Sequence, residues 1–162
     1  LCNRAMLAAA ELQARLAALK QEREAKGLHG ASVGVGLHYG DVAYGNVGAP
    51  TRLDFTVIGP SVNLASRVES LCFKLQADVL ATEDFVNLSG CKVTWDPRGE
   101  HQVKGVSDLV SVYELNHALI NSRKEKIIQH DDTNKAKHSW LSLLVRGETT
   151  HIFVSFVLQF YV

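Results

Sequence analysis

The spacing of apolar and polar residues along the chain changes its period near residue 30. Before that point, residues 3–26 are rich in the helix formers Ala, Leu, Glu, Gln, Lys and Arg. Apolar residues recur there at steps of three and four: Ala5, Ala9, Leu12, Leu16 and Leu19. This stripe predicts an amphipathic helix. It is shorter than the three or four heptads of a coiled coil, so we expect the helix to pack on its own sheet.

The next segment alternates with the two-residue period of a strand. Apolar residues at 33, 35 and 37 are interleaved with two glycines and a histidine, which predicts a strand over 33–38 with one crowded face and one bare face. We expect the bare face to admit a closely packed helix or another subunit. A turn at 39–41 and a second strand over 42–47 complete a predicted hairpin. A loop at 48–51 then leads to a third strand over 53–58.

The chain up to residue 116 continues as a mixture of helices and strands without regular β–α–β alternation. The expected elements are, in order, a helix over 61–75, a strand over 77–82, a short helix over 83–88, and strands over 93–95 and 110–115, with residues 99–105 between the last two. This pattern is typical of an α+β domain.

Residues 117–162 form a tail of different character, which we leave unassigned. Its first part is polar and charged and predicts a helix followed by a linker. Its end, from His151 on, is apolar, aromatic and β-branched, which is the profile of an aggregation-prone strand. The sequence does not assign this strand a place in the domain.

Composition excludes several classes of function. Seventeen basic and seventeen acidic residues balance, so no global field is available to attract nucleic acid or a membrane surface. The three cysteines lack metal-site spacing and indicate free thiols in a reducing compartment. The N-terminus lacks a signal-peptide pattern, and no apolar run reaches the roughly 18 residues of a membrane span. We therefore expect a cytoplasmic setting for this chain, whose parent protein could still be membrane-tethered.

Three candidate sites are set aside on local grounds. The glycines of GVGLHYG are spaced as GxGxxxG, and no helix follows them as a dinucleotide fingerprint requires. His38 has no second ligand at metal spacing, so a structural or strand-edge role is favoured. Asp41 is interpreted as a turn residue. No nucleophile–base pair and no activated cysteine is predicted.

The helix that follows Pro60 carries the strongest candidate chemistry. Asn63 and Arg67 lie one turn apart near its start, where backbone N–H groups and the helix dipole favour anions. The guanidinium is a planar fork of donors for phosphate oxygens, and the amide can orient a sugar or ring oxygen. The competing interpretation is a solvated polar stripe, to which Ser70 and Lys74 also belong.

Three blocks of sequence resemble one known family. DFTVIGPSVNLASRVE (54–69) resembles the signature of the class III nucleotidyl cyclases, the adenylate and guanylate cyclase catalytic domains. VGVGLHYGDVAYGNVGAPTRLDFTVIG (33–59) resembles that family's G-I-H-x-G-x-V-x-x-G-N-x-G hairpin, and HQVKGVSDLVSVYEL (101–115) resembles its closing L-K-G strand pair. The resemblance covers roughly 3–116. It implies a ferredoxin-like nucleotidyl cyclase fold and assigns 1–116 to the C-terminal portion of such a domain.

The resemblance also implies a role for each matching residue. Asn63 would orient the ribose, and Arg67 would stabilise charge on the α-phosphate as the 3′-hydroxyl attacks and pyrophosphate leaves. Lys104 would hold the terminal phosphates. Thr56 occupies the purine-selecting position, where threonine is similar to bacterial adenylate cyclases. The implied activity is conversion of ATP to cyclic AMP and pyrophosphate in intracellular signalling.

The resemblance is incomplete at its start. The family's two metal-binding aspartates and an adenine-contacting lysine precede the matched region, so the resemblance implies that N-terminal strands and the ligands of Mg²⁺ or Mn²⁺ are not in this chain. Asp41 and Asp54 lie in the wrong blocks to replace them, whereas Pro60, in place of a frequent acid, suits a first helical turn. We expect sheet edges left unpaired.

In the family, active sites form between two domains, so the implied partner is a second cyclase domain in a homodimer or heterodimer. This chain alone, even as a homodimer, is expected to be inactive and to need a partner with metal ligands. Two alternatives remain open: a non-catalytic nucleotide-binding or dimerisation module, and a helical interaction module built on residues 3–26.

Overall fold

The computed structural model describes residues 2–30, 32–49, 52–122 and 153–161. A five-stranded sheet has the order β5-β6-β4-β1-β7, and β2 and β3 form a separate two-stranded sheet. The strands are β1 (Ser32–Gly40), β2 (Ala43–Ala49), β3 (Arg52–Ile58), β4 (Val79–Thr82), β5 (Trp95–His101), β6 (Val110–Leu115) and β7 (Phe153–Tyr161). The helices are α1 (Cys2–Ala25), α2 (Pro60–Leu75), α3 (Glu83–Leu88) and the 3₁₀ turn η1 (Lys92–Thr94). The expected α+β class is confirmed.

Helices cover both faces of the five-stranded sheet. Val35 and Leu37 of β1 belong to a core cluster shared with α1 and α3. The next strand alternates in the same way, because Val79 and Ala81 enter that cluster, whereas Leu80 enters a second one beneath α2. Because successive side chains of a strand point to opposite faces, the sheet lies between α1 and α3 on one side and α2 on the other.

The bare face of β1 is the surface on which α2 packs. A Cβ added to Gly34 would lie 2.9 Å from Cys72 Cβ, and one added to Gly36 would lie 2.5 Å from the backbone nitrogen of Glu69. Contacts this short do not occur between real side chains, so both positions need glycine. The prediction that these glycines admit a closely packed helix is therefore confirmed.

Helix α1 packs on the sheet through its first half. Cys2, Met6 and Ala9 are buried in the core, and the Gln13 side chain donates to the carbonyl oxygens of Val33 (2.7 Å) and Asp78 (3.1 Å). This contact confirms that the helix packs on its own sheet. The predicted stripe was too long, however, because Leu19 is 47% exposed.

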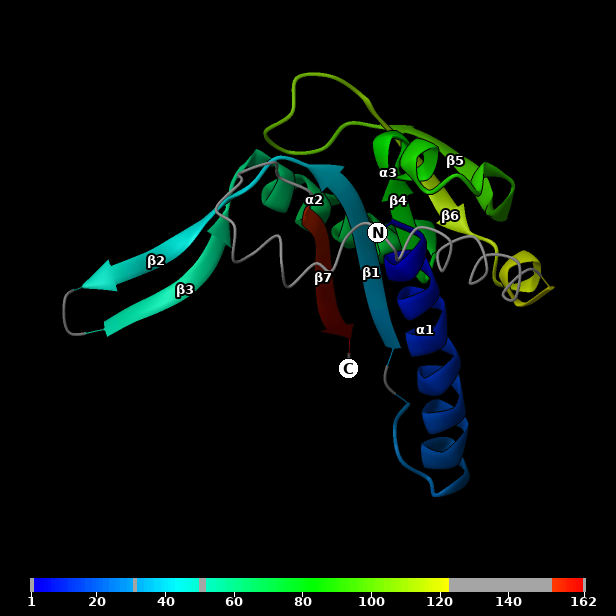
Figure 1. Cartoon of the computed structure of the whole chain (residues 1–162). Helices are drawn as coiled ribbons and strands as arrows, with labels where there is room; N and C mark the ends of the chain where they lie inside the picture. Colours follow the sequence, from blue (N-terminus) through cyan, green and yellow to red (C-terminus); the bar gives the residue numbers. More distant parts are fainter. Residues whose placement is uncertain (1, 31, 50–51, 123–152, 162) are drawn as a thin grey trace, which may run out of the picture.

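The predicted hairpin between the first two strands is wrong. β1 pairs with β4 in parallel and with β7 in antiparallel orientation, whereas β2 pairs with β3. Figure 1 shows β2 and β3 extending away from the body of the domain as an arm. The reason for the error is that a period of two predicts a strand but not its partner. The tip of the arm, 50–51, lies outside the described residues.

Two further corrections concern the second half of the chain. Residues 92–94 form the 3₁₀ turn, and the strand predicted over 93–95 instead begins at Trp95 and extends to His101. The apolar C-terminal stretch forms a strand as expected, but this strand pairs with β1 along its whole length. The β1 edge is thus covered by β7, and Ile120 is buried in the core. The domain division at residue 116 stays a prediction.

Candidate functional site

Helix α2 presents three stripes with different environments. Ala65 and Cys72 face the glycines of β1, and Val68 and Leu71 enter the second core cluster. The third stripe is exposed and consists of Asn63, Arg67, Ser70 and Lys74. The helix starts at Pro60, whose missing N–H costs nothing at a first turn, so the predicted Asn–Arg pair lies in its first two turns.

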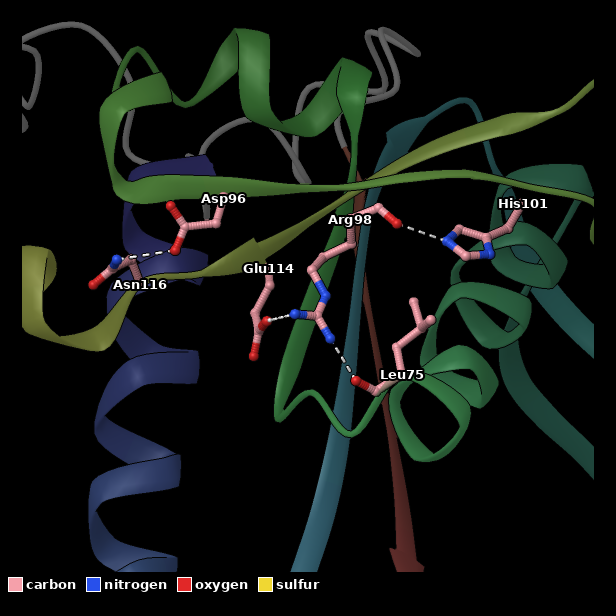
Figure 2. A network of polar contacts seen from close by, with 6 residues as sticks. All are labelled: Leu75, Asp96, Arg98, His101, Glu114 and Asn116. Carbon is pink, nitrogen blue, oxygen red and sulfur yellow. Dashed lines mark hydrogen bonds and ion pairs between the residues drawn. The ribbon is translucent and has the colours of Figure 1, made fainter.

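The environment of Arg67 differs from that of Arg98, whose contacts are shown in Figure 2. The Arg98 guanidinium donates to the Leu75 carbonyl oxygen at 2.6 Å, at the C-terminal end of α2, and pairs with Glu114 at 3.2 Å. Across the described ranges, by contrast, no hydrogen bond or ion pair engages the side chain of Arg67 or Asn63. Arg98 therefore ties β5 and β6 to the helix, whereas Arg67 presents its donors to solvent.

Lys104 lies in a turn that packs against α2. Val103 is 4% exposed and Val106 is partly buried, and both belong to the cluster that contains Val68 and Leu71 of the helix. The turn closes through a hydrogen bond of 3.3 Å from the Val106 N–H to the Val103 carbonyl oxygen. Gly105 has φ of 82°, a conformation that glycine adopts without strain. These contacts hold the exposed lysine beside α2.

Thr56 lies on the projecting arm, in β3, and is half-buried. Its directly paired residue across the arm is Gly45 of β2. Gly45 lies in the G-N-x-G part of the family-like hairpin motif, but the sequence did not relate it to Thr56, because that relation depends on the strand register. No hydrogen bond or ion pair joins Thr56 to Asn63, Arg67 or Lys104 within the described part of the chain.

His38 has a structural role, as predicted. Its side chain is 6% exposed, and Nδ1 shares a hydrogen bond of 2.9 Å with Thr82 Oγ1 across the parallel pair β1–β4. Burial lowers the pKa of this imidazole, and the nearby Asp84 carboxylate opposes the shift. Burial also raises the pKa of Cys72 to about 12, so this thiol is not an activated nucleophile. All three cysteines are free thiols.

The described residues do not provide a metal site. No group of three or more His, Cys, Asp or Glu side chains within them could hold an ion. A pocket of about 380 Å³ at the carboxyl ends of β1 and β4 contains two carboxylates, those of Asp41 and Asp84. Mg²⁺ is commonly held by one or two carboxylates together with waters and substrate phosphates, but Asp41 and Asp84 belong to no group of three or more candidate ligands in the described ranges, and they lie outside the blocks in which the family's metal aspartates occur. We therefore derive no step through a metal held by these residues.

Comparison with known proteins places the chain in a family. Residues 2–117 match the adenylate and guanylate cyclase catalytic domain, and the chain belongs to that family. An adenylate cyclase of Anabaena cylindrica is 40% identical over 92 residues, 55% of this chain and 18% of that protein. Adenylate cyclase 1 of Rhizobium meliloti (strain 1021) is 34% identical over 104 residues, 64% of this chain and 16% of that protein. The chain thus spans less than a fifth of either relative.

Solved structures agree with this assignment. The adenylyl cyclase CyaB from P. aeruginosa is similar with a TM-score of 0.58 and 32% identity, over 65% of this chain and 53% of that chain. The guanylyl cyclase Cya2 is similar with a TM-score of 0.59 and 27% identity, over 70% and 57%. The predicted ferredoxin-like cyclase fold is confirmed. No helix among the described residues is long and apolar enough to cross a membrane.

Proposed function

We propose that this domain supplies the ribose-orienting and charge-stabilising half of an adenylate cyclase site. The observation that carries the proposal is the exposed pair Asn63 and Arg67, one turn apart at the start of α2 and without a partner in the described part of the chain. Nucleotidyl transfer depends mainly on positioning and on donors aimed at developing charge. A guanidinium kept free of structural ion pairs is suited to that purpose.

Each proposed role is that of the matching residue in the family motif. Arg67 stabilises the charge that builds on the α-phosphate while the 3′-hydroxyl attacks and pyrophosphate leaves, and Asn63 orients the ribose. Lys104, held beside α2 by its turn, binds the terminal phosphates. Thr56 contacts the purine, and its hydroxyl can accept a hydrogen bond from the adenine amine, which supports ATP as the substrate.

A second cyclase domain completes the proposed site. The β2–β3 arm carries Thr56 and extends from the body of the domain (Figure 1), and an isolated two-stranded hairpin is marginally stable in water. We infer that the arm packs on a second domain, in a homodimer or a heterodimer, and that the nucleotide lies at this interface. The ligands for Mg²⁺ or Mn²⁺ would come from a second domain that carries the family's metal aspartates, because a second copy of this chain would not supply them. A cytoplasmic location, where ATP is present, is part of the proposal.

The proposal is tested by complementation. The chain is mixed with a cyclase domain that keeps its metal aspartates but lacks its own Asn–Arg pair, ATP and Mn²⁺ are added, and cyclic AMP is measured. We expect product from the mixture and none from either component. Arg67→Ala should lower turnover on the order of 10²–10³-fold, by analogy with the loss of one preorganised donor. Lys104→Ala should mainly raise the KM for ATP.

Two outcomes separate the alternatives. Binding of ATP without product, in a mixture whose components associate, would identify a non-catalytic nucleotide-binding or dimerisation module. Product that does not depend on Arg67 would show that the exposed stripe of α2 is only a solvated surface. Binding of a partner by α1 alone would instead support a helical interaction module.

A further inference from the structure

The glycine opposite Thr56 has no structural explanation in the arm itself. Gly45 and Thr56 are a direct pair in β2–β3, and the register of that pairing continues without a shift from Ala43 to Ala49. Gly45 is therefore not at a bulge. Glycine in the interior of a strand weakens it, and one that marks no bulge or bend often marks a close approach by a ligand or another backbone.

At other positions the structure shows why glycine is required. Gly36 is crowded by the backbone of α2, and Gly105 has a positive φ. At Gly45 a Cβ would meet nothing within 4 Å, and its φ is not positive. Among the described residues, therefore, neither crowding nor backbone conformation requires a glycine there.

The missing side chain leaves space beside the Thr56 hydroxyl. Directly paired residues of an antiparallel ladder point to the same face, with Cβ atoms about 4.5–5.5 Å apart. A branched side chain at position 45 would therefore stand next to Thr56, on the side from which any group bound by that threonine approaches. Gly45 is half-buried, so the space is partly screened from solvent.

We propose that Gly45 belongs to the base-binding site, where it keeps open the space that the edge of a purine base occupies against Thr56. This inference rests on the proposed function, because it assumes that Thr56 contacts the base. The proposal requires no hydrogen bond between Gly45 and the nucleotide. Its contribution is the volume that it leaves free.

The test is a kinetic comparison of Gly45→Val with a matched control in the complementation mixture. Ala43→Val adds a branched side chain to the same face of the same strand, two residue pairs further along, opposite Ile58. We expect Gly45→Val to raise the KM for ATP by about 10-fold or more, because even one extra methylene in an apolar pocket changes substrate discrimination by roughly 10–200-fold. The turnover of Gly45→Val at saturating ATP should stay within about twofold of the parent value. For Ala43→Val, both turnover and the KM for ATP should stay within about twofold of the parent values.

Each other result overturns the inference. A KM unchanged by Gly45→Val in an active mixture would show that the space is not used by the base. Loss of association, measured by sedimentation, would show that Gly45 contacts the second domain instead. If the valine variant does not fold, Gly45→Ala takes its place, and an unchanged KM overturns the inference equally. An inactive parent mixture would overturn the proposed function itself, and with it this inference.

Discussion

Gly36 of β1 lies directly against the backbone of Ala65 in α2. A Cβ at position 36 would collide with the Ala65 carbonyl oxygen and would lie 2.5 Å from the Glu69 backbone nitrogen. Backbone atoms of a helix cannot rotate away as the end of a side chain can. The distance between α2 and the sheet, and hence the position of the exposed Asn63–Arg67 pair, depends on this glycine.

Gly36→Ala is therefore expected to destabilise the protein by about 1–3 kcal/mol, the usual cost of overpacking a core. Urea unfolding followed by circular dichroism measures this change. Gly45→Ala is the matched control, because a Cβ there meets nothing within 4 Å and the substitution should leave stability unchanged or slightly raised. Equal unfolding midpoints for the two variants would contradict the close approach of α2.

The stability of the fold should fall below neutral pH in a way that depends on His38. Burial lowers the pKa of this imidazole in the folded state, so the unfolded chain, with a histidine pKa of about 6.5, binds the proton first. The contribution of His38 to the free energy of unfolding is fully present above the pKa of the unfolded chain. It is lost as the pH falls toward the lowered pKa of the folded state. Unfolding midpoints measured from pH 8 to pH 5 should thus decrease.

His38→Asn serves as the control for this pH dependence. Its amide can still bond to Thr82 in place of Nδ1, which is 2.9 Å away in the parent chain, but it does not titrate. The difference in stability between variant and parent should therefore change over the same pH range. A constant difference would assign the pH dependence to other groups.

Thiol reactivity should follow burial. Cys2 and Cys72 are buried, whereas Cys91 is partly exposed, and burial raises the pKa of Cys72 to about 12. At pH 8 iodoacetamide should modify Cys91 well before the other two, and peptide mass mapping identifies the labelled residue. In denaturant all three should react at similar rates. Fast labelling of Cys72 in the folded protein would contradict its position between α2 and β1.

Substitution of Arg98 should affect stability, whereas substitution of Arg67 should affect turnover. Arg98→Ala removes the donor to the Leu75 carbonyl and the contact with Glu114, and because these groups are partly exposed, we expect a loss of about 1 kcal/mol or less. Arg67→Ala should leave the unfolding midpoint unchanged and lower turnover in the complementation mixture. Equal effects of the two substitutions on stability would remove the distinction between a structural and a functional arginine.

Local sequence patterns predicted several helix bounds and two surface features correctly. The bounds of α2 and α3 were predicted within a residue, and the bare face of β1 and the exposed stripe of α2 followed from periods of two and 3.6 residues. Such features depend on neighbours a few positions away, so they are visible in the order of residues. The family signature likewise occupies one short block, which includes Asn63 and Arg67.

Which distant segments pair with each other is determined by the tertiary structure and not by local sequence. Whether β1 pairs with β2 or with β4 and β7 depends on which apolar faces are buried together, and every strand of period two carries the same local signal. The packing of the Lys104 turn on α2, through Val103, joins residues about thirty positions apart in sequence. The pairing of Gly45 with Thr56 needs the register of the arm. Loop-closure entropy and shared burial, rather than local periodicity, select these contacts.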